Sequence, residues 1–374
     1  MAGNRITNME VKRKNRNRIY RYIRKNGVVS NPDIAYELKL SLPTVTQNTK
    51  ELLEMGLVKE HGELESTGGR KAKAIVVDAD SKIAVGLDIT KNHIGLLMIN
   101  LTGEMLKYER IYCPFCRSEM YFCEVHSRLE QFLEKDGVDR KKILGLGISI
   151  PGIIDLEKKE ITNSHVLDIE AIPFSEIEQF FPYPCIFLND ANAGAYAEGI
   201  QSEEERFFYL SLSNTVGGGL FASGKLIYGS DFRCGEVGHM TVVPDGFPCY
   251  CGKAGCLDSY CGANRLATLA DGKLEMFFEE LKNGRKEFEE EWEQYMKYLA
   301  IAVNNIHMVL DCDIILGGYV GSHLEDYIQE IRQKVSERNT FSEKGNFVKK
   351  CNYKVGAAAL GAALYVTELF VEQI

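Results

Sequence analysis

Residues 238–256 read GHMTVVPDGFPCYCGKAGC and set one histidine ahead of three closely spaced cysteines. The candidate ligands are His239, Cys249, Cys251 and Cys256. One imidazole and three thiolates form the soft tetrahedral donor set that zinc prefers, and the glycines at 252 and 255 allow a short loop to wrap an ion. Because four protein ligands would fill the coordination sphere, the pattern predicts one structural zinc per chain, with no open position for catalysis.

Other interpretations of the cysteines are weaker. Four unrelated loop residues would rarely show the spacing Cys-x-Cys-x4-Cys just after a histidine. Cys261 is a spare candidate ligand, but the set ending at Cys256 is already sufficient. Cys113 and Cys116 form a second Cys-x-x-Cys without a partner pair, so we interpret them as ordinary packing or loop thiols.

Composition limits the class of protein. The chain has 374 residues, 45% of them hydrophobic, so it can build large cores, and its length predicts two or three domains. Its 11 cysteines, an odd number spread along the chain, do not form a small-domain disulfide framework. The first residues contain no apolar signal-peptide core, and no segment approaches 18 uninterrupted apolar residues. We therefore expect a cytoplasmic protein that does not enter a membrane.

Charge divides the chain into two unequal parts. Residues 1–77 contain 15 Lys and Arg against 8 Asp and Glu, a net charge of +7, so the rest of this −9 chain carries −16. The run KRKNRNR alone could be a solvated basic tail. Its neighbours, however, follow the order helix, helix, helix, hairpin. The expected elements are helices at 11–25, after Ser30 and after Ser41, and strands at 57–59 and 74–77 around a turn at 68–70.

The helix signals in this segment are specific. The box Ser30-Asn31-Pro32-Asp33 caps the second helix, and Ser41 with Pro43 opens the third. The residues expected to face inward from the third helix are Val45, Thr49, Leu52 and Leu53. This leaves Thr44, Gln47, Asn48 and Lys50 outside. The stretch resembles the winged helix-turn-helix of bacterial repressors, and a small protein-interaction module is the alternative.

A repressor-like interpretation assigns double-stranded operator DNA as the partner, read by a homodimer or homotetramer on a two-fold site. Short polar side chains at the start of the third helix suit base edges, and the cations around them suit phosphates. The predicted DNA-binding residues are Thr44, Thr46, Gln47, Lys50 and Arg70.

From about residue 80 the sequence alternates strands and helices with glycine-rich turns. Two stretches, residues 83–106 and 206–229, have the form strand, polar turn, strand, which indicates two similar lobes as in actin-like sugar kinases. Buried strands at 145–150 and 185–189 end in Pro-Gly and in Asn189-Asp190, and active sites of α/β folds lie at such strand ends.

The whole chain resembles the ROK family of repressors, open reading frames and sugar kinases. The resemblance depends most on GEVGHM followed by CYCGKAGC, and GAAALGAAL fits the closing helix of the family. It implies an α/β fold: a two-lobed, actin-like (ribonuclease H-like) ATPase and sugar kinase fold after an N-terminal winged helix-turn-helix. The expected domains are residues 1–78 and 79–374, with lobes at about 79–188 plus the C-terminal helix and at about 189–357.

The resemblance also implies a sugar site. The residues that match it are Asn189, Asp190, Glu236 and His239, with Asp258 where the family usually has glutamate. Asp258 is one methylene shorter, which predicts a different ligand size or orientation. From the residue alone, Asp190 could equally be a helix cap at a strand end. The metal loop is expected to hold the sugar site in place, with His239 giving one ring nitrogen to zinc and the other to the ligand.

The phosphate loops depart from the family pattern. The first-lobe turn, usually Asp-x-Gly-Gly-Thr, reads DITKN from Asp88, and the second-lobe loop keeps only its last three glycines, at 217–219. Thr215 replaces a glycine there and would be strained at positive φ. Without a positioned phosphoryl donor, the base candidate Asp190 is vestigial. We expect a sugar-responsive regulator, most simply a repressor released by a sugar or sugar phosphate, and not an enzyme; the alternative is an ATP-dependent, glucokinase-like ROK sugar kinase with a DNA-binding domain.

Overall fold

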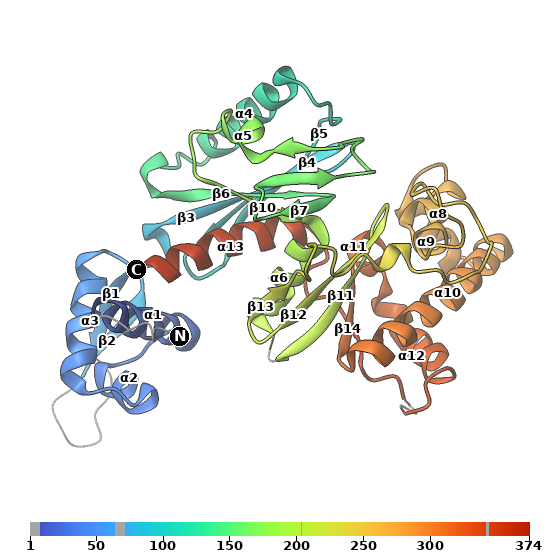
Figure 1. Ribbon diagram of the computed structural model, residues 1–374. Coiled ribbons are helices and arrows are strands. Elements are labelled where there is room, and N and C mark those ends of the chain that lie inside the picture. The colour runs from blue at the N-terminus through green and yellow to red at the C-terminus, as the bar shows by residue number, and fades with distance from the viewer. Residues whose placement is uncertain (1–7, 64–71, 203, 342–343) are drawn as a thin grey trace, which may run out of the picture.

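The computed structural model describes residues 8–63, 72–202, 204–341 and 344–374. Its first part is a small helical domain with a two-stranded wing (Figure 1). The elements are α1 (Asn8–Asn26), α2 (Asn31–Leu38), α3 (Leu42–Glu54), β1 (Val58–Glu63) and β2 (Lys73–Val77). The strands pair antiparallel, and the predicted turn at 68–70 lies outside the described residues.

Both predicted helix starts are confirmed. Ser30 and Asp33 form a reciprocal capping box at α2, and the Ser41 side chain accepts a hydrogen bond from the Thr44 N–H at α3. Each such cap satisfies a backbone donor that the helix itself leaves unpaired, a contribution of about 1 kcal/mol. The Ser30 box thus fixes the start of α2, and the Ser41 cap fixes the start of α3 after the short turn that joins the two helices.

The end of the chain completes the core of the N-terminal domain. Val371 and Ile374 at the end of α13 (Ala357–Gln373) are buried in the same cluster as Ile19 and Ile23 of α1. Glu368 forms ion pairs with Arg21 and Arg24, the latter at 3.7 Å. Figure 1 shows α13 running from the first lobe to this domain.

The first lobe is built on a five-stranded sheet of order β10-β6-β3-β4-β5. Its strands are β3 (Ile83–Ile89), β4 (His93–Asn100), β5 (Met105–Tyr112), β6 (Ile143–Ile150) and β10 (Cys185–Asn189). Alternate β3 residues bury against opposite layers: Val85 and Leu87 pack in the cluster that contains α4 (Glu119–Glu134), whereas Ala84 packs with α13. A small sheet of β7 (Ile153–Asp155), β8 (Glu160–Asn163) and β9 (Ile172–Pro173), followed by α5 (Phe174–Glu178), lies between β6 and β10 along the chain.

The second lobe repeats this plan with a sheet of order β13-β12-β11-β14-β15. Its strands are β11 (Arg206–Leu212), β12 (Val216–Ala222), β13 (Lys225–Ile227), β14 (Asp313–Gly317) and β15 (Val348–Lys350). Its helices are α7 (Asp258–Cys261), α8 (Ala263–Thr268), α9 (Leu274–Lys282), α10 (Lys286–Leu310), α11 (Gly318–Gly321) and α12 (Ile328–Ser336). In both lobes an antiparallel meander is followed by a strand parallel to its first strand, so the predicted repeat is confirmed.

Two helices lie between the sheets, α6 (Asp190–Gln201) and α13. Their contact is so close that a Cβ on Gly361 would lie 1.7 Å from the Ala193 carbonyl oxygen. A Cβ on Gly147 of β6 would lie 2.2 Å from the Ala362 oxygen of α13. Only glycine permits these approaches, so α13 is held firmly against both α6 and the first sheet.

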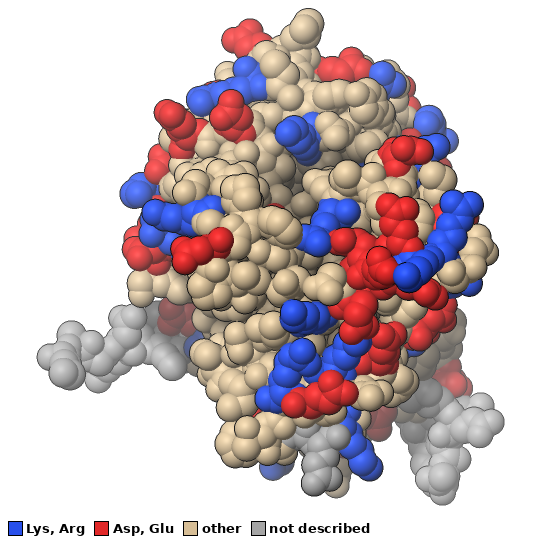
Figure 2. Space-filling model, turned by 90° about the vertical axis from the view of Figure 1, so that its right-hand side faces the viewer, with Lys and Arg blue, Asp and Glu red and all other residues tan. Residues whose placement is uncertain are grey.

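In the part of the chain that the structure describes, no helix is long and apolar enough to cross a membrane. Figure 2 shows the second-lobe side, where acidic and basic side chains are interspersed and the acidic ones gather in one area. Such a surface differs from the basic first segment and does not suit a polyanion.

Candidate functional site

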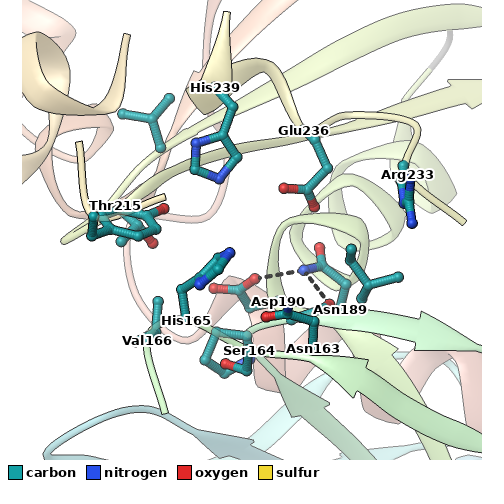
Figure 3. A pocket seen from close by; sticks show the side chains of 16 residues that line it. Asn163, Ser164, His165, Val166, Asn189, Asp190, Thr215, Arg233, Glu236 and His239 are labelled. Carbon is teal, nitrogen blue, oxygen red and sulfur yellow. Dashed lines mark hydrogen bonds between the residues drawn. The ribbon is translucent and has the colours of Figure 1, made fainter. Parts of the chain in front are cut away.

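A cavity of about 230 Å³ lies where the carboxyl ends of β6 and β10 face the second lobe (Figure 3). Figure 3 shows Asp190, Glu236 and His239 pointing toward one space, with His165 below His239 and Arg233 on the far side of Glu236. The residues lining it are Pro151, Gly152, Ile153, Asn163, Ser164, His165, Val166, Asn189, Asp190, Thr215, Val216, Gly217, Arg233, Glu236, His239 and Tyr250. The structure thus brings four of the five predicted sugar-site residues into one cavity wall.

Asn189 and Asp190 stand at the junction of β10 and α6. Asn189 is the cap of α6: its Oδ1 accepts from the Asn192 N–H at 3.0 Å, while its Nδ2 donates to the Gly152 carbonyl at 3.1 Å. Asp190 is therefore the first helical residue and not the cap. Its Oδ1 accepts from the Ala191 N–H at 2.9 Å, which leaves Oδ2 without a partner among the described residues.

The carboxyl groups of the site share a partly desolvated region. Burial raises the pKa of Asp190 to about 6, and the nearby Glu236 carboxylate adds to this rise. Burial also raises the pKa of Glu236, while His165 and Arg233 act in the opposite direction. Asp190 is half-buried and Glu236 is exposed, so the carboxylates of both can accept hydrogen bonds from the hydroxyl groups of a ligand in the cavity.

Asp88 on β3 is a third carboxyl group of this region. Burial raises its pKa to about 7, the charge of Asp190 adds to the rise, and the hydrogen bond from Ser149 Oγ at 2.9 Å opposes it. Asp88 does not line the cavity itself; it lies behind Asp190 on the side of the first-lobe turn.

Asp88→Asn is expected to stabilise the protein by roughly 1–3 kcal/mol at pH 8 and by less at pH 5. The folded-state pKa of about 7 exceeds the unfolded value of about 3.9, so the native state binds the extra proton, and stability is lost as pH rises across this window. Asparagine carries no charge and its Oδ1 still accepts from Ser149. Thermal unfolding at both pH values tests this, with Asp326→Asn at an exposed site as control; an equal change at both pH values would contradict it.

The predicted metal ligands form one compact group. One donor atom from each of His239, Cys249, Cys251 and Cys256 lies within 4.8 Å of all the others. The distance is 3.8 Å both from Cys251 Sγ to Cys256 Sγ and from Cys249 Sγ to His239 Nδ1. Ligands about 2.3 Å from one tetrahedral ion lie about 3.8 Å apart, so the donor set fits zinc in size as well as in softness. Cys261 is buried elsewhere, where its Sγ donates to the Tyr295 carbonyl.

The metal loop also supplies a wall of the cavity. Tyr250 stands between two of the cysteines, and its ring lies 5.4 Å from the His239 ring and 5.7 Å from the His165 ring. Its hydroxyl donates to Asp258 Oδ2 at 3.2 Å, and the same oxygen accepts from the Val216 N–H at 2.7 Å. Asp258 is buried, and it is not among the described residues that line the cavity. In this structure it positions Tyr250 and Val216.

Close packing explains why Gly218 and Gly219 of the second lobe have no side chain. A Cβ on Gly218 would lie 2.2 Å from the Phe208 ring, and one on Gly219 would lie 2.7 Å from Ala195 Cβ. The Thr215 backbone stays outside the left-handed region, so the predicted strain does not arise. Retained glycines here accordingly carry no evidence for phosphate binding.

A contact across the lobes lies beside the first-lobe turn. Arg110 of β5 donates from Nη2 to the Tyr319 hydroxyl of α11 at 3.3 Å, and its guanidinium lies 5.1 Å from that ring. Burial raises the pKa of Tyr319 to about 12, and the charge of Asp88 adds to the rise. The contact therefore lies close to Asp88 and to the first-lobe turn.

The candidate nucleic-acid interface lies on α3. Thr46, Gln47 and Lys50 are exposed, and Thr44 is half-buried. Gln47 donates to Glu51 Oε1 at 2.8 Å, and Lys50 forms a weak pair with Glu54 at 3.7 Å. The prediction that Asn48 lies outside is wrong: Asn48 is buried and donates to the Thr44 carbonyl at 2.8 Å. Arg70 lies outside the described residues.

Comparison with known proteins identifies the family to which this chain belongs. The ROK family model matches residues 84–368, and a model of winged helix-turn-helix DNA-binding domains matches residues 12–59. The chain therefore belongs to the ROK family. Its fold is the actin-like sugar kinase fold behind an N-terminal winged helix-turn-helix, as expected from the sequence.

Particular relatives are regulators. The xylose repressor of Bacillus subtilis (strain 168) is 25% identical over 97% of this chain and 97% of its own. The DNA-binding transcriptional dual regulator NagC of Escherichia coli (strain K12) is 27% identical over 67% of this chain and 62% of its own.

Solved structures agree on the fold. A ROK family transcriptional regulator, a homolog of the E. coli MLC protein, superposes with a TM-score of 0.78 at 21% identity, covering 97% of this chain and 98% of the other. A ROK family glucokinase from Streptomyces griseus in complex with glucose and AMPPNP gives 0.65 at 22% identity, covering 76% and 98%. At these identities the two structures establish the architecture and nothing finer.

Sequence reasoning missed several residues that line the cavity, among them Asn163, His165, Arg233 and Tyr250. Asn163 is the last residue of β8 in the first lobe, His165 follows two residues later, and Arg233 lies in the loop before Glu236. Tyr250 had a local signal, because it stands between two candidate metal ligands. The others come from segments with no periodic or spacing pattern, so only the fold brings them to the site.

Proposed function

We propose that this protein is a DNA-binding transcriptional repressor released by a sugar. Residues 1–78 would bind a two-fold operator, in a homodimer or homotetramer in the cytoplasm, and residues 79–374 would bind the effector. The repressors of xylose and N-acetylglucosamine genes among the relatives support this role.

One observation carries the proposal: a polar cavity lined by the carboxyl groups of Asp190 and Glu236 lies in the same chain as a capped winged helix-turn-helix. Asn189, Asp190, Glu236 and His239 offer hydroxyl-binding groups, and Asp258 would act through Tyr250. Helix α6 begins at Asp190 and packs against α13, and the end of α13 packs in the core of the N-terminal domain. Closure of the lobes around a sugar would therefore change the position of the DNA-binding domain.

Zinc would act as a structural cofactor. Held by His239, Cys249, Cys251 and Cys256, it would stiffen the loop that carries Tyr250 and present the second imidazole nitrogen of His239 to the cavity. A closed set of four protein ligands leaves no position for substrate, so the ion would organise the site and perform no chemistry.

Sugar kinase activity is the competing function. The chain has Asp190, the residue that would act as the base of a kinase. Its first-lobe turn, however, lacks the two glycines of the family pattern, and Arg110 contacts Tyr319 beside Asp88. We propose that no phosphoryl transfer occurs. Full-length protein incubated with ATP, Mg²⁺ and D-xylose, D-glucose or N-acetylglucosamine should release no ADP above the background without sugar; sugar-dependent ADP would support the kinase instead.

Lys50→Ala should weaken operator binding and reduce the slope of log affinity against log salt by about one, as expected for one lost phosphate contact. The DNA would be selected from a random pool by the full-length protein, and its binding measured by fluorescence anisotropy. Lys286→Ala, at an exposed lysine on α10 that also pairs with a glutamate four residues on, is the matched control and should change neither quantity. A protein lacking residues 1–78 that still bound this DNA would refute the assignment.

A further inference from the structure

A second cavity, of about 290 Å³, adjoins the first, and Ile153 and Arg233 line both. Neither cavity alone reaches the range of about 300 to 1,000 Å³ that small-molecule sites commonly occupy, whereas the two together do. We infer that the effector extends through both cavities and is a neutral disaccharide or glycoside, larger than a single sugar. The inference rests on the proposed function and specifies its ligand.

The second cavity is built from both lobes. One wall comes from the hairpin of β7 and β8, and the other from the loop at 230–233 that precedes Glu236. Its polar lining residues are Asp155, Glu157, Lys158, Thr162, Ser230, Asp231 and Arg233. A ligand that fills it would contact both lobes at a second place, in addition to the contacts at Asp190 and Glu236.

Arg233 stands at the junction of the two cavities. Among the described residues, no hydrogen bond or ion pair reaches its guanidinium, although it is near enough to Glu236 to act on the pKa of that carboxyl. The preceding residue, Phe232, has a left-handed backbone with φ of 56°, a conformation that is unfavourable for a bulky side chain. The loop therefore holds a strained conformation that directs an unpaired donor toward the boundary between the two cavities.

Charge selects a neutral second unit over a phosphate. Asp155, Glu157 and Asp231 face the second cavity, and of its two cations Lys158 is already paired with Asp155 at 3.2 Å and with Glu160 at 3.8 Å. With three carboxylates and two cations, the lining already has a net charge of −1, and a phosphate would add about −1.5 to −2 more. Sugar hydroxyls can instead donate to the carboxylates and accept from Arg233.

The test compares matched ligands by isothermal titration calorimetry on the full-length protein. The pairs are D-xylose with xylobiose, D-glucose with cellobiose, and N-acetylglucosamine with chitobiose, and the phosphates are glucose 6-phosphate and N-acetylglucosamine 6-phosphate. At least one disaccharide should bind about tenfold or more tightly than its own monosaccharide, since two additional net hydrogen bonds are worth about that factor.

A variant locates the second unit. Ser230→Trp places a large side chain in the second cavity and should reduce the affinity for the disaccharide to that for the monosaccharide. Ser127→Trp, on the exposed face of α4, is the matched control and should keep the disaccharide advantage. If Ser230→Trp does not fold, as judged by thermal unfolding, the comparison of ligands on the unmodified chain still decides.

Three results would overturn the inference. They are a panel in which no disaccharide binds more tightly than its own monosaccharide, a sugar phosphate that binds more tightly than every disaccharide, and a Ser230→Trp protein that keeps the disaccharide advantage. A monosaccharide that binds best and also releases operator would leave the proposed function standing while removing this extension. Absence of binding by every sugar in the panel would refute both.

Discussion

Asp190→Ala should bind operator as tightly as the unmodified protein and should no longer be released by sugar. Asp190 lines the cavity, and one of its carboxyl oxygens has no partner among the residues that the structure describes, so its loss would remove hydrogen bonds to the ligand. It lies in the ROK domain at the start of α6, outside the winged helix-turn-helix. Anisotropy titrations of operator, with and without the effector identified by calorimetry, measure the result.

The size of the effect follows from linkage. If sugar lowers operator affinity by about 5- to 150-fold, operator must lower sugar affinity by the same factor, a coupling of about 1 to 3 kcal/mol. Asp190→Ala is expected to reduce this factor to one at sugar concentrations that saturate the unmodified protein. The matched control, Asp326→Ala at an exposed pair with Lys282, should retain full release. Release of Asp190→Ala at the same sugar concentration as the unmodified protein would exclude this cavity as the effector site.

The structure offers a physical route for this coupling. Helix α6 begins at Asp190 and touches α13 so closely that Gly361 has no room for a side chain. The same α13 ends with Val371 and Ile374 in the core of the N-terminal domain and with Glu368 paired to arginines of α1. A shift of α6 on ligand binding therefore changes contacts that also position the DNA-binding helices.

The features that the sequence could predict are those whose residues lie close together along the chain. The four metal-ligand candidates lie within one loop, so their spacing alone revealed the cluster that the structure brings together. The caps Ser30 and Ser41 each act on a residue three positions further along the chain, and both helices begin where they indicate. His165 and Arg233, by contrast, reach the cavity only because β8 and the loop before Glu236 come together in the fold.

Asn48 shows why a polar residue can be misplaced. It lies three residues after Val45 and four before Leu52, so helical geometry places it on the buried side of α3. The prediction gave polarity more weight than position, yet the amide can be buried because its Nδ2 donates to the Thr44 carbonyl. Asp258 differs in kind: the resemblance implies a ligand contact, while its observed partners are Val216 and Tyr250.

Loss of the metal should have the largest effect on stability. Cys251→Ala is expected to lower the zinc content from about one per chain, to lower the Tm by roughly 5 °C or more, and to abolish the sugar response while operator affinity is kept. Three ligands remain but leave the loop open, and this loop carries Tyr250, whose hydroxyl contacts Asp258. Elemental analysis, thermal unfolding and operator titrations provide the three readouts.

The matched control for this change is Cys123→Ala, an exposed cysteine on α4 far along the chain from the metal loop. It should alter neither zinc content nor Tm, because its thiol belongs to no ligand set among the described residues. Purified protein with well under one zinc per chain would contradict the assignment directly. A Cys251→Ala protein that loses zinc yet responds to sugar normally would show that the ion and the cavity are independent, since Tyr250 would then hold its place through Asp258 alone.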